Sequence, residues 1–220
     1  AEFVRMINSL APQVVLLQEW TASGPGDIQQ WFDLNVPSLG PWHVVQMEGV
    51  DAAIASRLPL TKVGQPLEVV KEDGTRRRIP FSSAFVQTPY GDVLLGSVHL
   101  KCCGTKDSPE DELRLLEGEA INEFVREQLG KGAPLPVVIT GDMNLVGTRN
   151  PLDRIAQDLD VDGSTLRITD AYTATGAGND TWRSDEGQFS PGRLDYVLFA
   201  DGALNAANAY VFDTAFLDGA

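Results

Sequence analysis

Residues 134–147 constrain the fold of this chain more than any other stretch. Two prolines lead into a run of β-branched residues at positions 137–139, which is typical of a buried strand, although periodicity alone does not distinguish it from a short buried helix. Gly141 then ends the strand, and Asp142 and Asn144 follow. Residues two positions apart in an extended segment project to the same side, so both polar groups can face one cavity. The carboxyl end of such a strand is where α/β sheets usually hold their chemistry.

The overall charge argues against one class of function. The chain has 220 residues and a mass of 23.8 kDa, enough for a sizeable core, and no linker divides residues 1–220, so we expect a single domain. Its 17 basic and 31 acidic side chains give a formal net charge of −14. Proteins that bind duplex DNA chiefly through phosphates usually have the opposite balance. A phosphate substrate remains compatible with this charge, because bound divalent cations reverse the field inside a cleft.

The sequence does not predict a compartment. No run approaches the roughly eighteen consecutive apolar residues that a membrane-spanning helix needs, and no signal peptide is visible at the amino end. We therefore expect no stable membrane insertion and a soluble protein, for which cytoplasmic and secreted locations both stay open. No feature of the sequence predicts a protein partner.

Cys102 and Cys103 are the only cysteines, and they are adjacent. A vicinal pair forms no disulfide framework, and the chain has no Cys/His spacing of the kind that binds structural zinc. We expect two reduced thiols near the end of a strand.

Apolar spacing, caps and turn residues predict the other elements. Helices are expected at residues 2–10, at 27–34 with Asp27 as cap, after a Ser108 cap up to a stop at Gly130, and at 151–159. The third helix should bury a stripe formed by Leu113, Leu116, Ala120 and Phe124. Strands are expected at residues 14–17, 42–47, 52–55, several times between 61 and 100, and at 193–199; residues 170–172 should form a short strand or turn, and 204–216 an apolar segment.

Three arginines, at positions 76–78, follow the first of two predicted hairpin turns. Side chains alternate along a strand, so the three cannot all face one anionic site. A solvated flank of the hairpin is the expected role.

Polar side chains stand at four strand ends, where a folded core does not require them. They are Glu19, His99, Asp142 with Asn144, and Asp195. Taken singly, each has a structural explanation. Glu19 could be a solvated strand end, and His99 could have a structural role. Asp142 and Asn144 could form an Asx turn, and Asp195 could be a buried partner of Arg193 or of a backbone amine. Their combination is harder to explain by structure alone.

Six short elements occur in order between residues 14 and 199. They are Leu16-Leu17-Gln18-Glu19, Ser56-Arg57-Leu58-Pro59-Leu60, Ser97-Val98-His99-Leu100, Gly141-Asp142-Met143-Asn144, Asp180-Thr181-Trp182 and Arg193-Leu194-Asp195-Tyr196. In these elements the chain resembles the endonuclease/exonuclease/phosphatase superfamily, which includes DNase I, abasic-site endonucleases, neutral sphingomyelinases and inositol polyphosphate 5-phosphatases. The fourth and sixth elements are specific, whereas Ser-Arg-Leu-Pro and Thr-Trp are supporting.

The resemblance implies a fold, a cofactor and a reaction. The fold would be a four-layer α/β/β/α sandwich, in which two mixed β-sheets pack face to face with helices outside. The cofactor would be Mg²⁺, or alternatively Mn²⁺, anchored by Glu19, because a hard cation prefers carboxylate oxygen and keeps several waters. The reaction would be hydrolysis of a phosphodiester or phosphomonoester by activated water. The substrate could be a small molecule, a lipid head group or a nucleic acid.

The resemblance also implies roles for the other residues. Asp142 would orient or deprotonate the attacking water, and Asn144 would hold the phosphate or Asp142. His99 would donate a hydrogen bond to a phosphoryl oxygen or transfer a proton. Asp195 matches an aspartate that aligns a second histidine, as a triad carboxylate does. The expected substrate contacts, besides Asn144, are Arg57 and Trp182.

Two parts of the family pattern are missing from residues 1–220. No histidine follows His99, although the family has one in a Ser-Asp-His element near its carboxyl end, and the first strand with its metal-side asparagine would precede Ala1. A general acid–base group contributes about 10² to 10⁴ in rate, so we expect the chain alone to be weak or inactive. The alternative is a non-catalytic member of the fold, a binding or scaffold domain that kept the cleft and lost the ligands.

Overall fold

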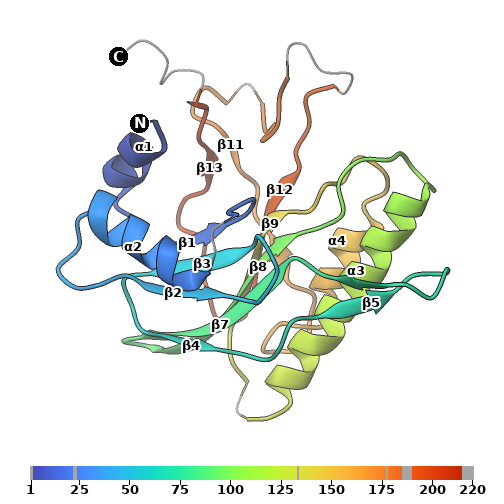
Figure 1. The fold of residues 1–220 in the computed structure, drawn as a ribbon, viewed down its shortest axis with the longest axis horizontal. Coiled ribbons are helices and arrows are strands. Elements are labelled where there is room, and N and C mark those ends of the chain that lie inside the picture. Colours follow the sequence, from blue (N-terminus) through green and yellow to red (C-terminus); the bar gives the residue numbers. More distant parts are fainter. Residues whose placement is uncertain (1, 22–23, 133, 177, 185–189, 215–220) are drawn as a thin grey trace.

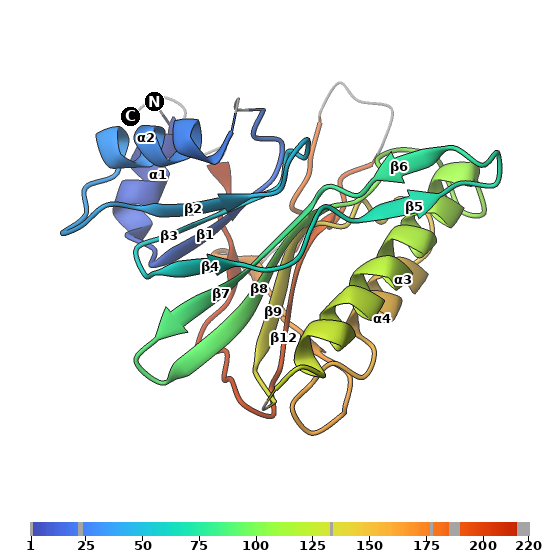
Figure 2. The same cartoon turned by 60° about the horizontal axis from the view of Figure 1, so that its bottom comes forward.

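Apolar side chains bring two β-sheets face to face, and helices cover the two outer faces (Figures 1 and 2). The structure, a computed structural model, describes residues 2–21, 24–132, 134–176, 178–184 and 190–214. The layer between the sheets is built from Val45 and Ile54 on one side and Ala84, Val86 and Leu95 on the other. This is the predicted α/β/β/α sandwich.

The smaller sheet has three antiparallel strands in the order β1-β3-β2. They are β1 (Val14–Leu17), β3 (Ala53–Ser56) and β2 (His43–Gln46). Two helices, α1 (Glu2–Leu10) and α2 (Pro25–Asn35), cover its outer face. The fully buried rings of Phe32 and Trp42, with centroids 4.7 Å apart, fill the space between helix and sheet.

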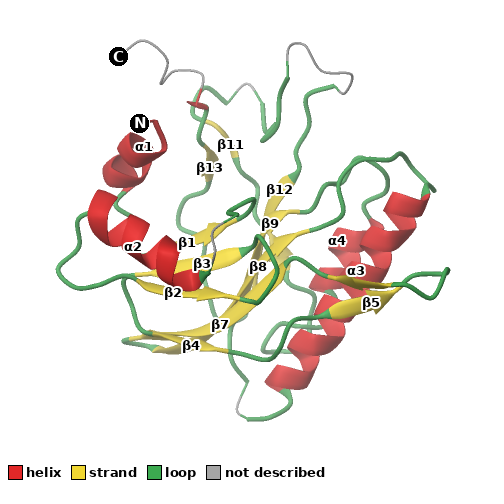
Figure 3. Cartoon of the chain, viewed as in Figure 1, coloured by secondary structure: helices red, strands yellow, loops and turns green. Residues whose placement is uncertain are grey.

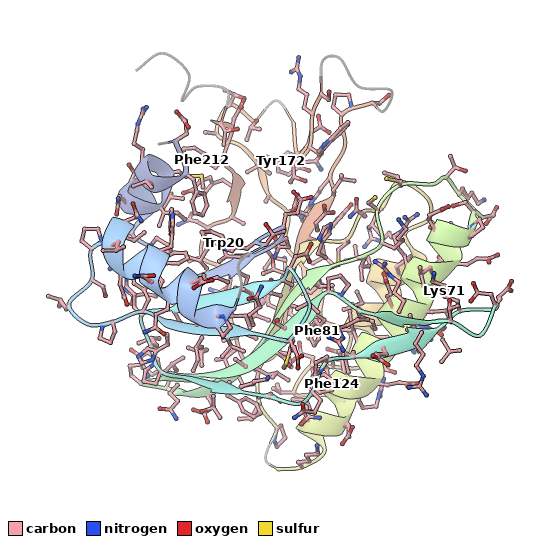
Figure 4. All side chains as sticks on the ribbon, in the orientation of Figure 1. Trp20, Lys71, Phe81, Phe124, Tyr172 and Phe212 are labelled. Carbon is pink, nitrogen blue, oxygen red and sulfur yellow. The ribbon has the colours of Figure 1, made fainter. Side chains whose placement is uncertain are left out.

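The larger sheet has six strands in the order β10-β12-β9-β8-β7-β4 and is mixed, because β8 and β9 run parallel. They are β10 (Arg167–Ile168), β12 (Asp195–Phe199), β9 (Val137–Asp142), β8 (Gly91–His99), β7 (Phe81–Thr88) and β4 (Leu60–Lys62). Two helices, α3 (Pro109–Leu129) and α4 (Asn150–Ala156), cover the outer face (Figure 3). Phe81 of β7 and Phe124 of α3 pack edge to face at 5.8 Å in this core (Figure 4).

Four short strands lie outside the two sheets. They are the hairpin of β5 (Glu68–Val70) and β6 (Arg76–Arg78), and the parallel pair of β11 (Tyr172–Thr173) and β13 (Tyr210–Val211). Tyr172 of β11 falls within the segment predicted at 170–172, and β13 falls within that predicted at 204–216, of which residues 215 and 216 lie outside the described residues. No helix among the described residues is both long enough and apolar enough to cross a membrane.

Two buried serines tie the sheets together. Ser82 of β7 and Ser97 of β8 are register partners, and both side chains face the smaller sheet. The Ser97 hydroxyl donates to the carbonyl of Leu17 and accepts from the side-chain amide of Gln18, both at 2.9 Å. The Ser82 hydroxyl donates to the carbonyl of Ala52 at 2.7 Å. A buried hydroxyl without a partner is unfavourable, so these bonds fix where the ends of β1 and β3 lie over β8.

The helix α3 begins as predicted and buries the predicted stripe except for Leu116. The Ser108 hydroxyl accepts from the backbone N–H of Asp111, and acidic residues fill the first turn. Leu113 is 8% exposed, whereas Leu116, which was predicted in the buried stripe, is 38% exposed. Arg114 and Glu117 are fully buried on this face. Leu113, Ala120 and Phe124 pack in the core as predicted, but a stripe drawn from apolar residues alone leaves out the buried Arg114 and Glu117.

The predicted cap of α2 is wrong. The helix begins at Pro25, its N-cap position is Gly24, and no side chain caps it. Asp27 lies inside the first turn, where its charge complements the positive end of the helix dipole.

The three arginines of β6 alternate as predicted, but one of them is not solvated. Arg77 turns inward, and its Nε lies 2.9 Å from Oε1 of the buried Glu117. Arg76 and Arg78 lie on the opposite face, within 3.5 and 3.8 Å of Glu68.

The two leucines of α3 provide a matched test of this packing. Leu113→Ala should lower the free energy of unfolding by about 2–5 kcal/mol, because it opens a cavity in the core. Leu116→Ala should lower it by less than about 1 kcal/mol, because that side chain is already partly exposed to solvent and lies outside the core. Urea denaturation of both variants measures the difference, and equal losses would contradict the burial described.

Candidate active site

The register of the larger sheet brings three polar residues to one edge. The parallel pairing of β8 with β9 sets His99 beside Asp142. The antiparallel pairing of β12 with β9 sets Asp195 beside the same Asp142, so Asp195 begins its strand where the others end. Gly141 makes this approach possible: its φ is +148°, and a Cβ there would collide with the carbonyl of Val98.

Glu19 reaches this edge from the smaller sheet. It follows β1 with φ at +59°, and its side chain is 76% exposed. Gln18, bonded to Ser97, holds the turn against β8 two residues before His99. The Oε1 atom of Glu19 lies 4.0 Å from Nε2 of His99, so the ends of the two sheets meet at one point.

His99 is oriented by a residue that sequence analysis missed, Asp51. Its Oδ2 lies 3.0 Å from Nδ1 of His99, which directs Nε2 toward Glu19 and Asp142, each 4.0 Å away. The hydrogen bond to Asp51 is the main cause that raises the pKa of His99; the nearby carboxylates add to it and burial opposes it. The same bond lowers the pKa of Asp51.

The position of Asp51 follows from strand pairing rather than from a motif. β1 and β3 pair antiparallel with Leu17 opposite Ala53, and continuing that pairing by two residues sets Glu19 opposite Asp51. The backbone N–H of Trp20 donates to the carbonyl of Asp51 at 3.0 Å, which keeps the two segments side by side, one residue out of the register of the strands. Only a predicted register could have identified this aspartate.

Asp142 is the most perturbed carboxyl of the group. Burial is the main cause that raises its pKa from 3.8 to about 6, and the charge of Asp195 adds to the effect. Two interactions oppose the rise: the backbone N–H of Asn144, which donates to Oδ1 at 2.8 Å, and the positive charge on His99. The Asn144 side chain is buried, with its amide donating to the carbonyl of Leu100 at 3.0 Å. Of its two predicted roles, this geometry supports holding Asp142.

Asp195 is half-buried and does not form an ion pair with its neighbour Arg193. Burial raises the pKa of Asp195, and a side-chain hydrogen bond with Thr181 opposes that rise. Arg193 instead donates to the carbonyls of Thr169 at 2.7 Å and Asp195 at 3.3 Å, and it covers the ring of Tyr196. No second histidine faces Asp195 among the described residues; the other histidine of the chain lies in β2.

These groups line a cleft of about 470 Å³. Glu19, His99, Asp142 and Asn144 form one wall, and Trp182, Cys102 and Cys103 are also among its lining residues. Asp195 faces a neighbouring cavity of about 730 Å³, and Arg193 borders both spaces. Both cysteines are free thiols, as predicted.

The structure does not bring Arg57 to the cleft. Arg57 follows β3, and because β3 and β1 are antiparallel its backbone N–H bonds to Gln13, at the opposite end of β1 from Glu19. Its guanidinium donates to the carbonyl of Pro37 and lies 5.2 Å from the ring centroid of Trp42. The prediction that Arg57 contacts substrate is therefore corrected.

The donor set suits a cation that keeps most of its water. Among the described residues, no three His, Cys, Asp or Glu side chains are placed to enclose a metal ion. Glu19 is an exposed carboxylate beside two carboxyls, Asp142 and Asp195, whose pKa values are raised mainly by burial and further by the neighbouring negative charges. Mg²⁺ is commonly bound through one or two carboxylates and several waters, so these residues fit it.

Comparison with known proteins agrees with the fold. The model of the Endonuclease/Exonuclease/phosphatase family matches residues 1–215. No curated protein sequence matches the chain.

Many solved structures are similar to this chain, and three of them illustrate the likeness. A mannosyl-6-phosphatase of Bacteroides thetaiotaomicron has a TM-score of 0.60 at 17% identity, truncated TDP2 of Caenorhabditis elegans 0.56 at 17%, and beta toxin of Staphylococcus aureus 0.57 at 16%. The matches cover 90%, 90% and 91% of this chain and 75% of each of the others. The match to a hairpin-deletion form of the toxin covers only 61% of the toxin chain. At such identities the likeness shows the fold alone.

The raised pKa of Asp142 predicts how stability depends on pH. Because the folded state binds this proton more tightly than the unfolded state, the stabilisation is complete below pH 3.8 and is lost as the pH rises through about 6. At pH 8, Asp142→Asn should therefore raise the free energy of unfolding of the metal-free protein by about 1–3 kcal/mol, with little change at pH 4.

Urea denaturation in EDTA at both pH values measures this effect. Asp153→Asn on α4 is the matched control, because that carboxylate is exposed and pairs with Arg149 on the surface. Asp142→Asn effects of equal size at pH 4 and pH 8 would contradict the assignment.

Proposed function

The chain belongs to the endonuclease/exonuclease/phosphatase family, and from this premise we propose that it hydrolyses phosphate esters with Mg²⁺ or Mn²⁺ held mainly by Glu19. The observation that carries the proposal is the meeting of Glu19, His99 and Asp142 from both sheets at one cleft. When bound, the cation supplies positive charge that neutralises the phosphoryl oxygens.

Asp142 is suited to act on the attacking water. With a pKa of about 6 it is ionised near neutral pH yet more basic than an ordinary aspartate, which favours acceptance of a proton. Its Oδ1 is occupied by the backbone N–H of Asn144, so Oδ2 is left to face the cleft and His99. Asn144 thus fixes the carboxylate in one orientation and acts as a positioning residue.

His99 is suited to stabilise charge on the phosphoryl group. The Asp51 carboxylate accepts a hydrogen bond from Nδ1–H of His99, so Nε2 is the atom that faces the cleft. The raised pKa keeps the imidazole protonated to higher pH, and in that form Nε2 donates a hydrogen bond to a phosphoryl oxygen.

Asp195 acts mainly through its neighbour. Its charge is the second cause of the raised pKa of Asp142. Its predicted partner, a second histidine, is absent from the described residues. Such a histidine would donate a proton to the leaving oxygen. A general acid–base group of that kind contributes about 10² to 10⁴ in rate.

The lining of the cleft favours a compact substrate. Among its described residues Arg193 is the only Lys or Arg, and its guanidinium already binds two backbone carbonyls. The chain has a net charge of −14, so it offers little attraction to a polyanion. A single phosphate ester on a small or lipid-like group fits better than duplex DNA, with Trp182 lining the cleft where that group would bind.

Hydrolysis of bis-p-nitrophenyl phosphate and p-nitrophenyl phosphate tests the proposal. Turnover should require Mg²⁺ or Mn²⁺ and stop in EDTA. Asp142→Ala should lower kcat/KM by about 10² to 10⁴, because the water loses its base. Glu19→Gln should raise the Mg²⁺ concentration needed for half-maximal rate.

The matched control is Asp92→Ala, because Asp92 is exposed at the opposite end of β8 from His99 and should leave turnover unchanged. Absence of metal-dependent turnover on either ester would remove the enzyme proposal and leave the binding or scaffold domain. A steep loss of substrate affinity with added salt would instead indicate many phosphate contacts and contradict the compact substrate.

A further inference from the structure

The vicinal thiols at positions 102 and 103 lie in the wall of the same cleft as the proposed catalytic groups. Cys102 and Cys103 line the space together with Glu19, His99 and Asp142. Cys102 is half-buried and Cys103 is exposed, so both are accessible from the cleft or from solvent. The proposed hydrolysis uses neither of them.

The two sulfurs interact with each other. A side-chain hydrogen bond with Cys102 is the main cause that raises the pKa of the Cys103 thiol. Nζ of Lys101 lies 3.9 Å from Sγ of Cys102, which places a positive charge beside that sulfur. An attacking cysteine beside a resolving cysteine has this arrangement: a cation lies next to the first thiol, and the second thiol is protonated and in contact with the first.

Hydrogen bonds from α3 hold the loop that carries the thiols, both before Cys102 and at Cys103. Nη1 of Arg114 donates to the carbonyls of Lys101 at 2.9 Å and Cys103 at 2.8 Å. Oε2 of Glu117 accepts from the backbone N–H of Lys101 at 2.8 Å. Both charged side chains are fully buried on α3, so the loop cannot swing out of the cleft without breaking buried hydrogen bonds. A chemical change at the thiols must therefore be absorbed by the wall of the cleft.

We propose that Cys102 and Cys103 form a dithiol modification site, which low-molecular-weight disulfides oxidise reversibly to an intramolecular disulfide that reshapes the cleft. The effect on turnover rests on the proposed phosphoesterase function, whereas formation of the disulfide does not.

The reaction balances as two thiol–disulfide exchanges. Cys102, as thiolate, attacks the oxidant RSSR; a Cys102–SR bond forms, the RS–SR bond breaks, and one RSH leaves with the proton that Cys102 lost. Cys103 then loses its proton and attacks the Cys102 sulfur, so that the Cys102–Cys103 bond forms, the Cys102–SR bond breaks, and the second RSH leaves with the proton from Cys103. Two electrons pass from the protein thiols to the oxidant.

The product should be easy to reduce. Neighbouring Cα atoms across a trans peptide are about 3.8 Å apart, below the usual range of about 4.4–6.8 Å for disulfide-linked residues. The peptide between the two cysteines is trans, so the disulfide requires the backbone to distort. Strained disulfides have more oxidising potentials and are readily reversed by thiols.

Mass spectrometry of the 220-residue chain after treatment with oxidised glutathione tests the chemistry. The wild type should lose two hydrogen atoms and retain no glutathione. Cys103→Ser should retain one glutathione on Cys102, because the resolving thiol is gone, and Cys102→Ser should react more slowly. No reaction of the wild type, or a stable glutathione adduct on it, would overturn the proposal.

Turnover of p-nitrophenyl esters with Mg²⁺ tests the consequence, with each variant compared with its own reduced form. Oxidised wild type should lose about tenfold or more in kcat/KM, as expected when groups of a site are displaced, and dithiothreitol should restore it. The double variant Cys102→Ser/Cys103→Ser should not respond to the oxidant. Disulfide formation without a change in turnover would overturn the effect on the cleft. A reduced protein without turnover would instead refute the phosphoesterase proposal, while the mass measurement would still decide whether the disulfide forms.

Discussion

The hydrogen bonds of two neighbouring serines, Ser82 and Ser97, set the relation between the sheets on which the site depends. Each hydroxyl is buried between the layers and binds the backbone of the smaller sheet at the ends of β1 and β3. Apolar packing alone tolerates small sliding, but buried polar groups demand particular partners. The glutamate that follows β1 is thereby held opposite the ends of β8 and β9, so a site shared between two sheets has a defined geometry.

Electrostatics then give that geometry its chemical character. Three carboxyls and a histidine stand near one another, and burial raises the pKa values of Asp142 and Asp195. Such crowding is unfavourable for the metal-free fold and favourable for a cation, because positive charge relieves it. Asp51 directs His99 into the same space. A cation at this site would offset the negative charge that an anionic substrate meets in the cleft.

The sequence allowed us to identify the site residues that stand at the ends of predicted strands. It did not identify the residues whose position depends on which strands pair and in which register. Residues such as Asp142 can be recognised because a β-branched run and a glycine precede them. Asp51 and Arg57 could not be placed, because only the antiparallel register of β3 against β1 shows that one lies beside Glu19 and the other at the far end. The buried Arg114 and Glu117 were missed because apolar periodicity does not detect charged residues that bind the loop before α3.

The central claim is that one divalent cation binds at Glu19, where the two sheets meet. Anomalous diffraction from crystals of the protein soaked in Mn²⁺ tests it most directly, since Mn²⁺ can replace Mg²⁺ and is located without reference to activity. The account predicts one anomalous peak about 2.0–2.2 Å from a carboxylate oxygen of Glu19, on the side that faces Asp142. A saturated crystal with no peak at Glu19, or with its ordered Mn²⁺ bound elsewhere, would contradict it.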